Sequence, residues 1–177
     1  MSVSSQTEAM KAKTALYQDL LEKLQQLIGN ETDFVANAAN TAALLYHSLP
    51  DVNWVGFYFV RAGELVLGPF QGKPACVRIA MGKGVCGKAA AGMETVIVPD
   101  VAKFPGHIAC DPESKSEIAV PLLNWGHLIA ILDVDSANLN RFDEDDQEGL
   151  ETLASVFVGS QVTEDLPDLS EELAQSS

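Results

Sequence analysis

Residues 51–70 read DVNWVGFYFVRAGELVLGPF, and this pattern restricts the fold to one that contains a β-hairpin. β-Branched and aromatic residues fill two runs on either side of Ala62 and Gly63, which favour a turn, and the second strand is predicted to end at Pro69. Alternate residues of the first strand share a face, namely Trp54, Gly56 and Tyr58 on one side and Val55, Phe57 and Phe59 on the other. We expect the second set to face the core, and we expect Gly56 to open space between two aromatic side chains on the other face.

A second hairpin is predicted at 116–136, where SEIAVPLL and HLIAILDVDS flank the turn NWG. If this hairpin is symmetrical about Trp125, Glu117 lies opposite Asp133, and Asp135 lies on the same face as Asp133. The leucine and valine that alternate with the two aspartates then point to the core. Three carboxylates therefore converge on the opposite face.

Spacing alone leaves the role of these carboxylates open. Like charges so close raise one another's pKa, so the cluster would either hold a cation or keep one acid protonated near neutral pH. Both properties suit a substrate with an amine and a basic oxygen. Alternatively, the acids simply solvate one face of the strand, as charges usually do. We predict no metal site, because no further carboxylate lies at ligand spacing and the histidines are scattered at His47, His107 and His127.

Helices are predicted before, between and after the hairpins. Residues 14–28 place leucines at helical spacing, and a second helix, capped by Asn30 or Thr32, is predicted to end at about Ser48. The run MGKGVCGKAAAGM predicts a turn and a short helix, and FDEDDQEGLETLASVFV predicts a final helix with Asp143 as its N-cap. These elements predict an α+β fold with a central antiparallel sheet that carries helices on its faces.

Composition limits the domain organisation and the class of protein. A chain of 177 residues with 47% hydrophobic content suits one core, so we predict one domain at 14–160, between an N-terminal extension at 1–13 and an acidic, disordered tail at 161–177. No apolar run is long enough for a membrane span, and no signal peptide is readable, so a cytoplasmic protein without a membrane partner is expected. The net charge of −14 argues against a nucleic-acid partner.

All three cysteines lie in the segment between the hairpins, as Cys76, Cys86 and Cys110. An odd number of cysteines in a reducing compartment is poor material for a disulfide framework, so the thiols are either buried filler or redox-active. Cys110 lies in a loop of turn residues, which favours exposure. Cys86 lies at a predicted helix N-terminus between Lys83 and Lys88, an environment that should lower its thiol pKa.

Several of these motifs together resemble one known family. The cysteine separations of 86 − 76 = 10 and 110 − 86 = 24, the strands WVGFYF and SEIAVPL, the segments GKGVCGKA and FPGHIACD, and the run LDVDS resemble the free methionine-(R)-sulfoxide reductases, which are built on a GAF domain. The resemblance extends from about Ala15 to Val158. It implies a GAF-like fold and an enzyme that reduces the R sulfoxide of free methionine, not of methionine within proteins.

The resemblance also implies roles for individual residues. Cys110 matches the catalytic cysteine, Cys76 a resolving cysteine and Cys86 a further recycling cysteine, and the order in which the last two form a disulfide is left open. A proton shared with the sulfoxide oxygen would come from Glu117 or Asp135. The expected substrate-binding residues are Trp54 and Tyr58 at the methyl group, Asp133 at the ammonium group, and the backbone of Ile108, Ala109 and Cys110 at the carboxylate.

The implied reaction needs no bound cofactor. An external dithiol, expected to be thioredoxin, would reduce the enzyme's disulfide by exchange. The alternative is a GAF-type sensor, in which the pocket binds a metabolite and the cysteines report the redox state without turnover. The leucine face of the first helix could also pack on a second copy of the chain, which would make a homodimer.

Overall fold

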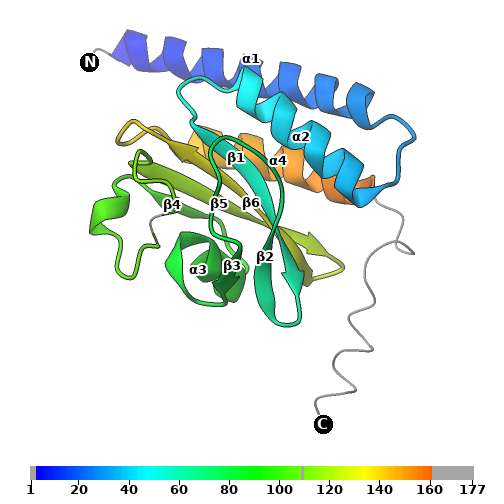
Figure 1. Cartoon of the computed structure of the whole chain (residues 1–177). Coiled ribbons are helices and arrows are strands. Elements are labelled where there is room, and N and C mark those ends of the chain that lie inside the picture. Colours follow the sequence, from blue (N-terminus) through cyan, green and yellow to red (C-terminus); the bar gives the residue numbers. More distant parts are fainter. Residues whose placement is uncertain (1–2, 109, 161–177) are drawn as a thin grey trace.

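The computed structural model describes residues 3–108 and 110–160, and it shows helices on both faces of one curled sheet (Figure 1). The helices are α1 (Val3–Ile28), α2 (Phe34–Ser48), α3 (Gly84–Gly92) and α4 (Glu144–Gly159), with a 3-10 helix η1 at Val101–Lys103. The strands are β1 (Trp54–Arg61), β2 (Glu64–Gln71), β3 (Arg78–Ala80), β4 (Val96–Val98), β5 (Ser116–Asn124) and β6 (His127–Ser136). The predicted acidic tail at 161–177 lies outside the described residues. Among the described helices, none is long and apolar enough to cross a membrane.

The six strands form one sheet in the order β3-β2-β1-β6-β5-β4, and every neighbouring pair is antiparallel. Both predicted hairpins are present, as β1–β2 and β5–β6. β2 continues to Gln71 because an irregularity in its pairing with β1 accommodates Pro69, which cannot donate a ladder hydrogen bond. The pairing of β1 with β6 joins the two hairpins at the centre of the sheet, so the aromatic residues of β1 lie beside the aspartates of β6.

Apolar cores cover both faces of the sheet. Val55, Phe57 and Phe59 pack with side chains of α1, α2 and α4, as predicted from their period of two. On the other face, Trp54 and Tyr58 are buried with side chains of α3. Gly56 therefore opens no space, contrary to the prediction: a Cβ atom there would contact the Trp54 ring and would lie 2.5 Å from Cβ of Phe70. The Trp54 ring fills the position that the glycine leaves.

Helix α1 begins earlier than the predicted start at residue 14. Residues 3–13 contain no glycine or proline and several strong helix formers, so nothing in that segment ends the helix. Lys13 Nζ lies 2.6 Å from carboxylate oxygens of both Asp143 and Asp146. The predicted boundary at residue 13 therefore falls inside a continuous helix, at a residue that is bound to α4.

Acidic side chains cap α2 and α4. Asp33 accepts a hydrogen bond from the backbone N–H three residues on, at 2.7 Å, so the N-cap of α2 lies after the predicted Asn30 and Thr32. Asp143 caps α4 as predicted. The Asp146 side chain accepts a hydrogen bond from the backbone N–H of Asp143, which completes a capping box. Both caps satisfy backbone groups that the first helical turn leaves unpaired.

Candidate active site

A small pocket lies between β5, β6, the first turn of α3 and the loop that carries Cys110. Thiol, acidic and apolar groups line it together: Tyr58, Ile79, Gly84, Val85, Cys86, His107, Ile108, Cys110, Asp111, Ser114, Glu117, Asp133 and Asp135. Its volume is about 30 Å³, which is room for about two water molecules. In this disulfide-bonded form the pocket is therefore too small for a free amino acid.

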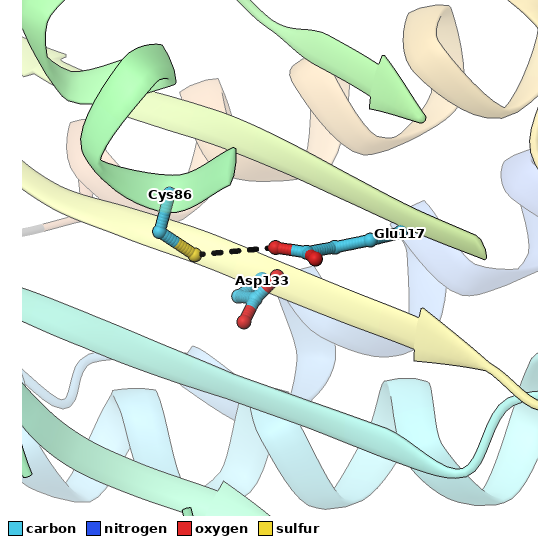
Figure 2. Close-up of side chains that lie close together, drawn as sticks. All are labelled: Cys86, Glu117 and Asp133. Carbon is cyan, nitrogen blue, oxygen red and sulfur yellow. Dashed lines mark hydrogen bonds between the residues drawn. The ribbon is translucent and has the colours of Figure 1, made fainter. Parts of the chain in front are cut away.

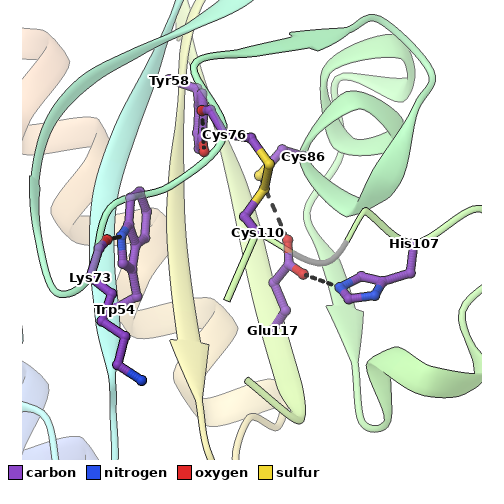
Figure 3. The surroundings of a disulfide bond; sticks show 8 residues. All are labelled: Trp54, Tyr58, Lys73, Cys76, Cys86, His107, Cys110 and Glu117. Atoms are coloured by element: carbon purple, nitrogen blue, oxygen red, sulfur yellow. Dashed lines mark hydrogen bonds and ion pairs between the residues drawn. A yellow bond between two sulfur atoms is a disulfide. The ribbon is translucent and has the colours of Figure 1, made fainter. Parts of the chain in front are cut away.

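A disulfide joins Cys76 to Cys110 across a sequence separation of 34 residues, with their Cα atoms 5.3 Å apart (Figure 3). Cys86 is a free, buried thiol. Of the two partners that the sequence left open for Cys110, the structure pairs it with Cys76. The hydroxyl of Tyr58 donates a hydrogen bond of 3.1 Å to the backbone carbonyl of Cys76, which places the disulfide against the pocket wall.

Cys86 lies in the first turn of α3 as predicted, but the prediction of a lowered pKa is wrong. Its side chain is 2% exposed, and its Sγ atom donates to Oε1 of Glu117 at 3.7 Å (Figure 2). Burial raises the pKa of the Cys86 thiol well above its usual range, and the charges of Asp133 and Glu117 raise it further. Lys88 points away and lies over the Phe104 ring, 5.6 Å from its centre. The thiol is therefore protonated at neutral pH.

The three predicted carboxylates do share the pocket face, but their register differs from the symmetrical one. Glu117 lies opposite Asp135, so the predicted pairing of Glu117 with Asp133 is wrong. The pairing is shifted by two residues in all: Asn124 lies opposite His127, so the turn is centred one half-residue beyond Trp125, which shifts the partner by one, and an irregularity at Leu122–Leu123 shifts it by one more. Because side chains of a strand alternate with a period of two, a total shift of two residues keeps all three acids on one face.

Burial determines the protonation of these acids. Burial, reinforced by the charges of Asp133 and Asp135, raises the pKa of Glu117 well above its usual range. The pKa of Asp135 is also raised well above its usual range, first by burial and then by the charge of Asp133. For Asp133, burial raises the pKa to about 6, although hydrogen bonds to its charged form oppose the shift. Asp133 is therefore the member of the cluster that ionises first as the pH rises.

His107 lines the pocket, although the positions of the three histidines in the sequence predicted no role for it. Its Nε2 atom lies 3.9 Å from Oε2 of Glu117 (Figure 3), and burial lowers the His107 pKa. Asp111 and Ser114 also line the pocket, and the side-chain amide of Asn53 donates hydrogen bonds to both, at 3.2 and 3.1 Å. The motif FPGHIACD places His107 and Asp111 within three residues of Cys110 and was the available signal for both.

The residues expected to bind the methyl and carboxylate groups of the substrate lie at different distances from the pocket. Tyr58 and Ile108 line the pocket, whereas Ala109 lies outside the described residues. Trp54 is one layer behind: its ring stacks on Tyr58 with centroids 6.0 Å apart, and its indole N–H donates to the Lys73 carbonyl at 3.0 Å (Figure 3). Trp54 thus supports Tyr58 and the segment that leads to Cys76.

Comparison with known proteins places this fold and pocket among GAF domains, whose family matches residues 14–158. Protein YtsP of Bacillus subtilis is 55% identical over 143 residues, which cover 80% of this chain and 88% of the relative. The free methionine-R-sulfoxide reductase of Escherichia coli is 50% identical over 143 residues, which cover 81% of this chain and 87% of the enzyme. The chain therefore belongs to the GAF-domain family of free methionine-R-sulfoxide reductases.

A solved structure agrees with this assignment. The free methionine-R-sulfoxide reductase from Neisseria meningitidis, determined in complex with its substrate, superposes with a TM-score of 0.82 at 45% identity. The match covers 93% of this chain and 94% of that one. The predicted GAF-like α+β fold is thus confirmed over most of the chain.

Proposed function

We propose that this chain reduces free L-methionine (R)-sulfoxide to methionine by thiol chemistry. The observation that carries the proposal is the Cys76–Cys110 disulfide at the wall of a pocket with three buried acids. A thiol pair that can cycle and acids that can donate a proton are the two requirements of sulfoxide reduction. Relatives at about half identity carry the name of this activity.

In the reduced enzyme, Glu117 or Asp135 shares its proton with the sulfoxide oxygen, which makes the substrate sulfur electrophilic. The Cys110 thiolate attacks, the oxygen passes to Cys110, and methionine leaves with Cys110 as the sulfenic acid. The Cys76 thiol then condenses with it, releasing water and forming the observed disulfide. An external dithiol, which we propose is thioredoxin, restores both thiols by exchange.

Asp133 suits the substrate ammonium group, because it ionises before the other two acids as the pH rises. Tyr58, supported by Trp54, forms the wall for the methyl group, and the backbone from Ile108 to Cys110 would bind the carboxylate. The pocket volume of about 30 Å³ means that reduction must separate the Cys76 and Cys110 loops before substrate enters. The cytoplasmic location and the homodimer remain predictions.

The test incubates reduced protein with dithiothreitol and one of three substrates: free L-methionine R-sulfoxide, free S-sulfoxide or a peptide-bound R-sulfoxide. Chromatography should detect methionine from the free R form alone. Cys110→Ser should abolish release, and Asp133→Ala should mainly raise the KM. No release from any substrate, with the thiols shown to be reduced, would favour a sensor that binds without turnover.

A further inference from the structure

We infer that the external dithiol reduces the disulfide by attacking the sulfur of Cys76, so that Cys110 leaves as the thiolate. Either sulfur of a disulfide can be attacked, and the choice decides which cysteine forms the mixed disulfide with the reductant. Both cysteines are half-buried, so exposure alone does not distinguish them. The inference deepens the proposed function and rests on it, because this exchange would complete each catalytic cycle.

The position of the pocket closes one direction of attack. Exchange brings three sulfur atoms nearly into line, so a thiolate must approach each sulfur from the side opposite to its disulfide partner. Cys110 lines the pocket together with Glu117, whereas Cys76 is not among its described lining residues, and Figure 3 shows Cys110 on the side of the bond that faces Glu117. An approach to Cys110 would therefore pass through a pocket of about 30 Å³, which has no room for a thiol-bearing molecule.

The surface next to Cys76 is open. Residues 72–77 connect β2 to β3 without a helix or a strand. Val77, the next residue after Cys76, is 64% exposed, and the side chains of Lys73 and Arg78 are exposed as well. A protein reductant can therefore reach this connection from solvent without entering the pocket.

The leaving group points to the same sulfur. The thiol with the lower pKa leaves faster, and apolar surroundings raise the pKa of a thiol. Cys76 packs against the apolar core on the α3 face of the sheet, so a Cys76 thiolate would form against apolar side chains. Cys110 instead shares the pocket with Glu117 and Asp135, two carboxylic acids that can donate a proton to its thiolate.

The start of α3 also favours a thiolate at Cys110. The N-cap residue, Lys83, makes no side-chain hydrogen bond to the first turn, which lines the pocket. The N-terminus of a helix stabilises a nearby negative charge through its free N–H groups. Ile108 packs on this turn, because a Cβ atom on Gly84 would lie 3.4 Å from the Ile108 side chain. The loop that carries Cys110 therefore lies against the helix start.

The exchange then has two steps. A thiolate of the reductant bonds to Sγ of Cys76 as the S–S bond breaks, and the electron pair of that bond leaves with Cys110. The second thiolate of the reductant attacks the reductant's own sulfur in the mixed disulfide, and Cys76 leaves as a thiolate that takes a proton from solvent. The dithiol loses two electrons and the disulfide gains them. Cys110 emerges as the thiolate that the next sulfoxide requires.

Glutathione is a suitable probe, because a monothiol has no second thiol with which to release itself from a mixed disulfide. The oxidised Cys86→Ser variant, which has no third thiol, is mixed with excess glutathione, quenched in acid at short times and alkylated with N-ethylmaleimide. Peptide mass spectrometry, extrapolated to zero time, identifies the first adduct before the released thiol can exchange. We expect glutathione on Cys76 at least about tenfold more often than on Cys110.

The unchanged protein should give the same ratio, which keeps the test valid if the Cys86→Ser variant folds poorly. Equal amounts of the two adducts, or an excess on Cys110, would overturn the inference. No sulfoxide is present, so the result is independent of the proposed function. An adduct on Cys76 without methionine release would remove the reductase alone, and methionine release with the adduct on Cys110 would remove this inference alone.

Charge variants test the direction of approach. Arg78→Glu places a negative charge beside residues 72–77 and should slow the attack of anionic glutathione about threefold at low salt. Lys103→Glu is the matched control, because Lys103 lies on η1 with its side chain 84% exposed. This control should react at the rate of the unchanged protein. Equal rates for the two charge variants would contradict an approach across residues 72–77.

Discussion

Lys73 Nζ lies 2.5 Å from Oε2 of Glu113, and this ion pair joins the loop that leads to Cys76 with the loop that follows Cys110. Asp111 contributes a second, longer contact to the same ammonium group at 3.8 Å. The indole of Trp54 holds the backbone carbonyl of Lys73 from the other side. Contacts at the edge of the pocket and outside it thus bring the two cysteine-bearing loops together.

Lys73→Met should slow the formation of the Cys76–Cys110 disulfide after one turnover. Because the ion pair is exposed, the effect should be less than about fivefold and should shrink at high salt. Acid quenching followed by mass spectrometry gives the rate. Lys23→Met removes an exposed ion pair with Asp19 on α1 and serves as control, with no change expected. A rate for Lys73→Met that equals that of the unchanged protein would contradict the proposed link.

Cysteine variants should fix the order of disulfide formation. After one equivalent of substrate, Cys86→Ser should still form the Cys76–Cys110 disulfide, because Cys86 is free and buried in the oxidised structure. Cys76→Ser should release one methionine and then retain Cys110 as sulfenic acid, trapped by dimedone. Rapid formation of a Cys86–Cys110 disulfide in Cys76→Ser would show that Cys86 can act as the resolving thiol.

Stability should fall in acid through Asp146, whose buried carboxylate accepts hydrogen bonds from Lys13, Tyr17 and Arg141. Burial alone would raise its pKa, but these partners outweigh burial and leave the pKa lowered. A lowered folded-state pKa stabilises the fold above the unfolded value of about 3.9, and this contribution is lost as the pH falls below it.

Asp146→Asn should therefore lower the free energy of unfolding at pH 7 by about 3 kcal/mol, because it removes the charge that pairs with Arg141, whose side chain is 8% exposed, and with the partly exposed Lys13. It should also flatten the decline in stability below about pH 4. Urea unfolding across pH gives both quantities. Asp143→Asn is the control, because Asn caps a helix as well as Asp does. Equal acid sensitivity of Asp146→Asn and the unchanged protein would remove Asp146 from this role.

Gly56→Ala should destabilise the fold by about 1–3 kcal/mol, because the new methyl group would meet the Trp54 ring and Phe70 in a filled core. Thermal or urea unfolding measures the loss. Gly92→Ala is the matched control: a Cβ atom there meets nothing within 4 Å, so stability should be unchanged or slightly higher. A Gly56→Ala variant as stable as this control would mean that Trp54 can shift at no cost.

Features that depend on neighbouring residues in the sequence, such as strand faces and helix caps, were predicted from local patterns. The period of two placed Asp133, Asp135 and Glu117 on one face, and the acidic run after Phe142 located the cap of α4. The register depended on the centre of the turn and on an irregularity at Leu122–Leu123, and neither leaves a signal in the pattern of polar and apolar residues.

Tertiary burial accounts for the remaining differences. The pKa of Cys86 depends on the depth at which α3 packs, and not on the lysines beside it in the sequence. His107 joins the pocket because the loop that carries Cys110 folds back over β5 and brings its side chain to Glu117. Neither depth nor loop path can be read from residue spacing.

The disulfide of Cys110 both binds its sulfur to Cys76 and leaves the pocket too small for an amino acid. On the proposed function, sulfoxide and reductant must then alternate, and methionine must depart before the dithiol acts. Such a cycle gives ping-pong kinetics, with parallel lines in double-reciprocal plots. When oxidant is abundant, most copies would wait in the oxidised form, so the supply of reducing equivalents would set the throughput.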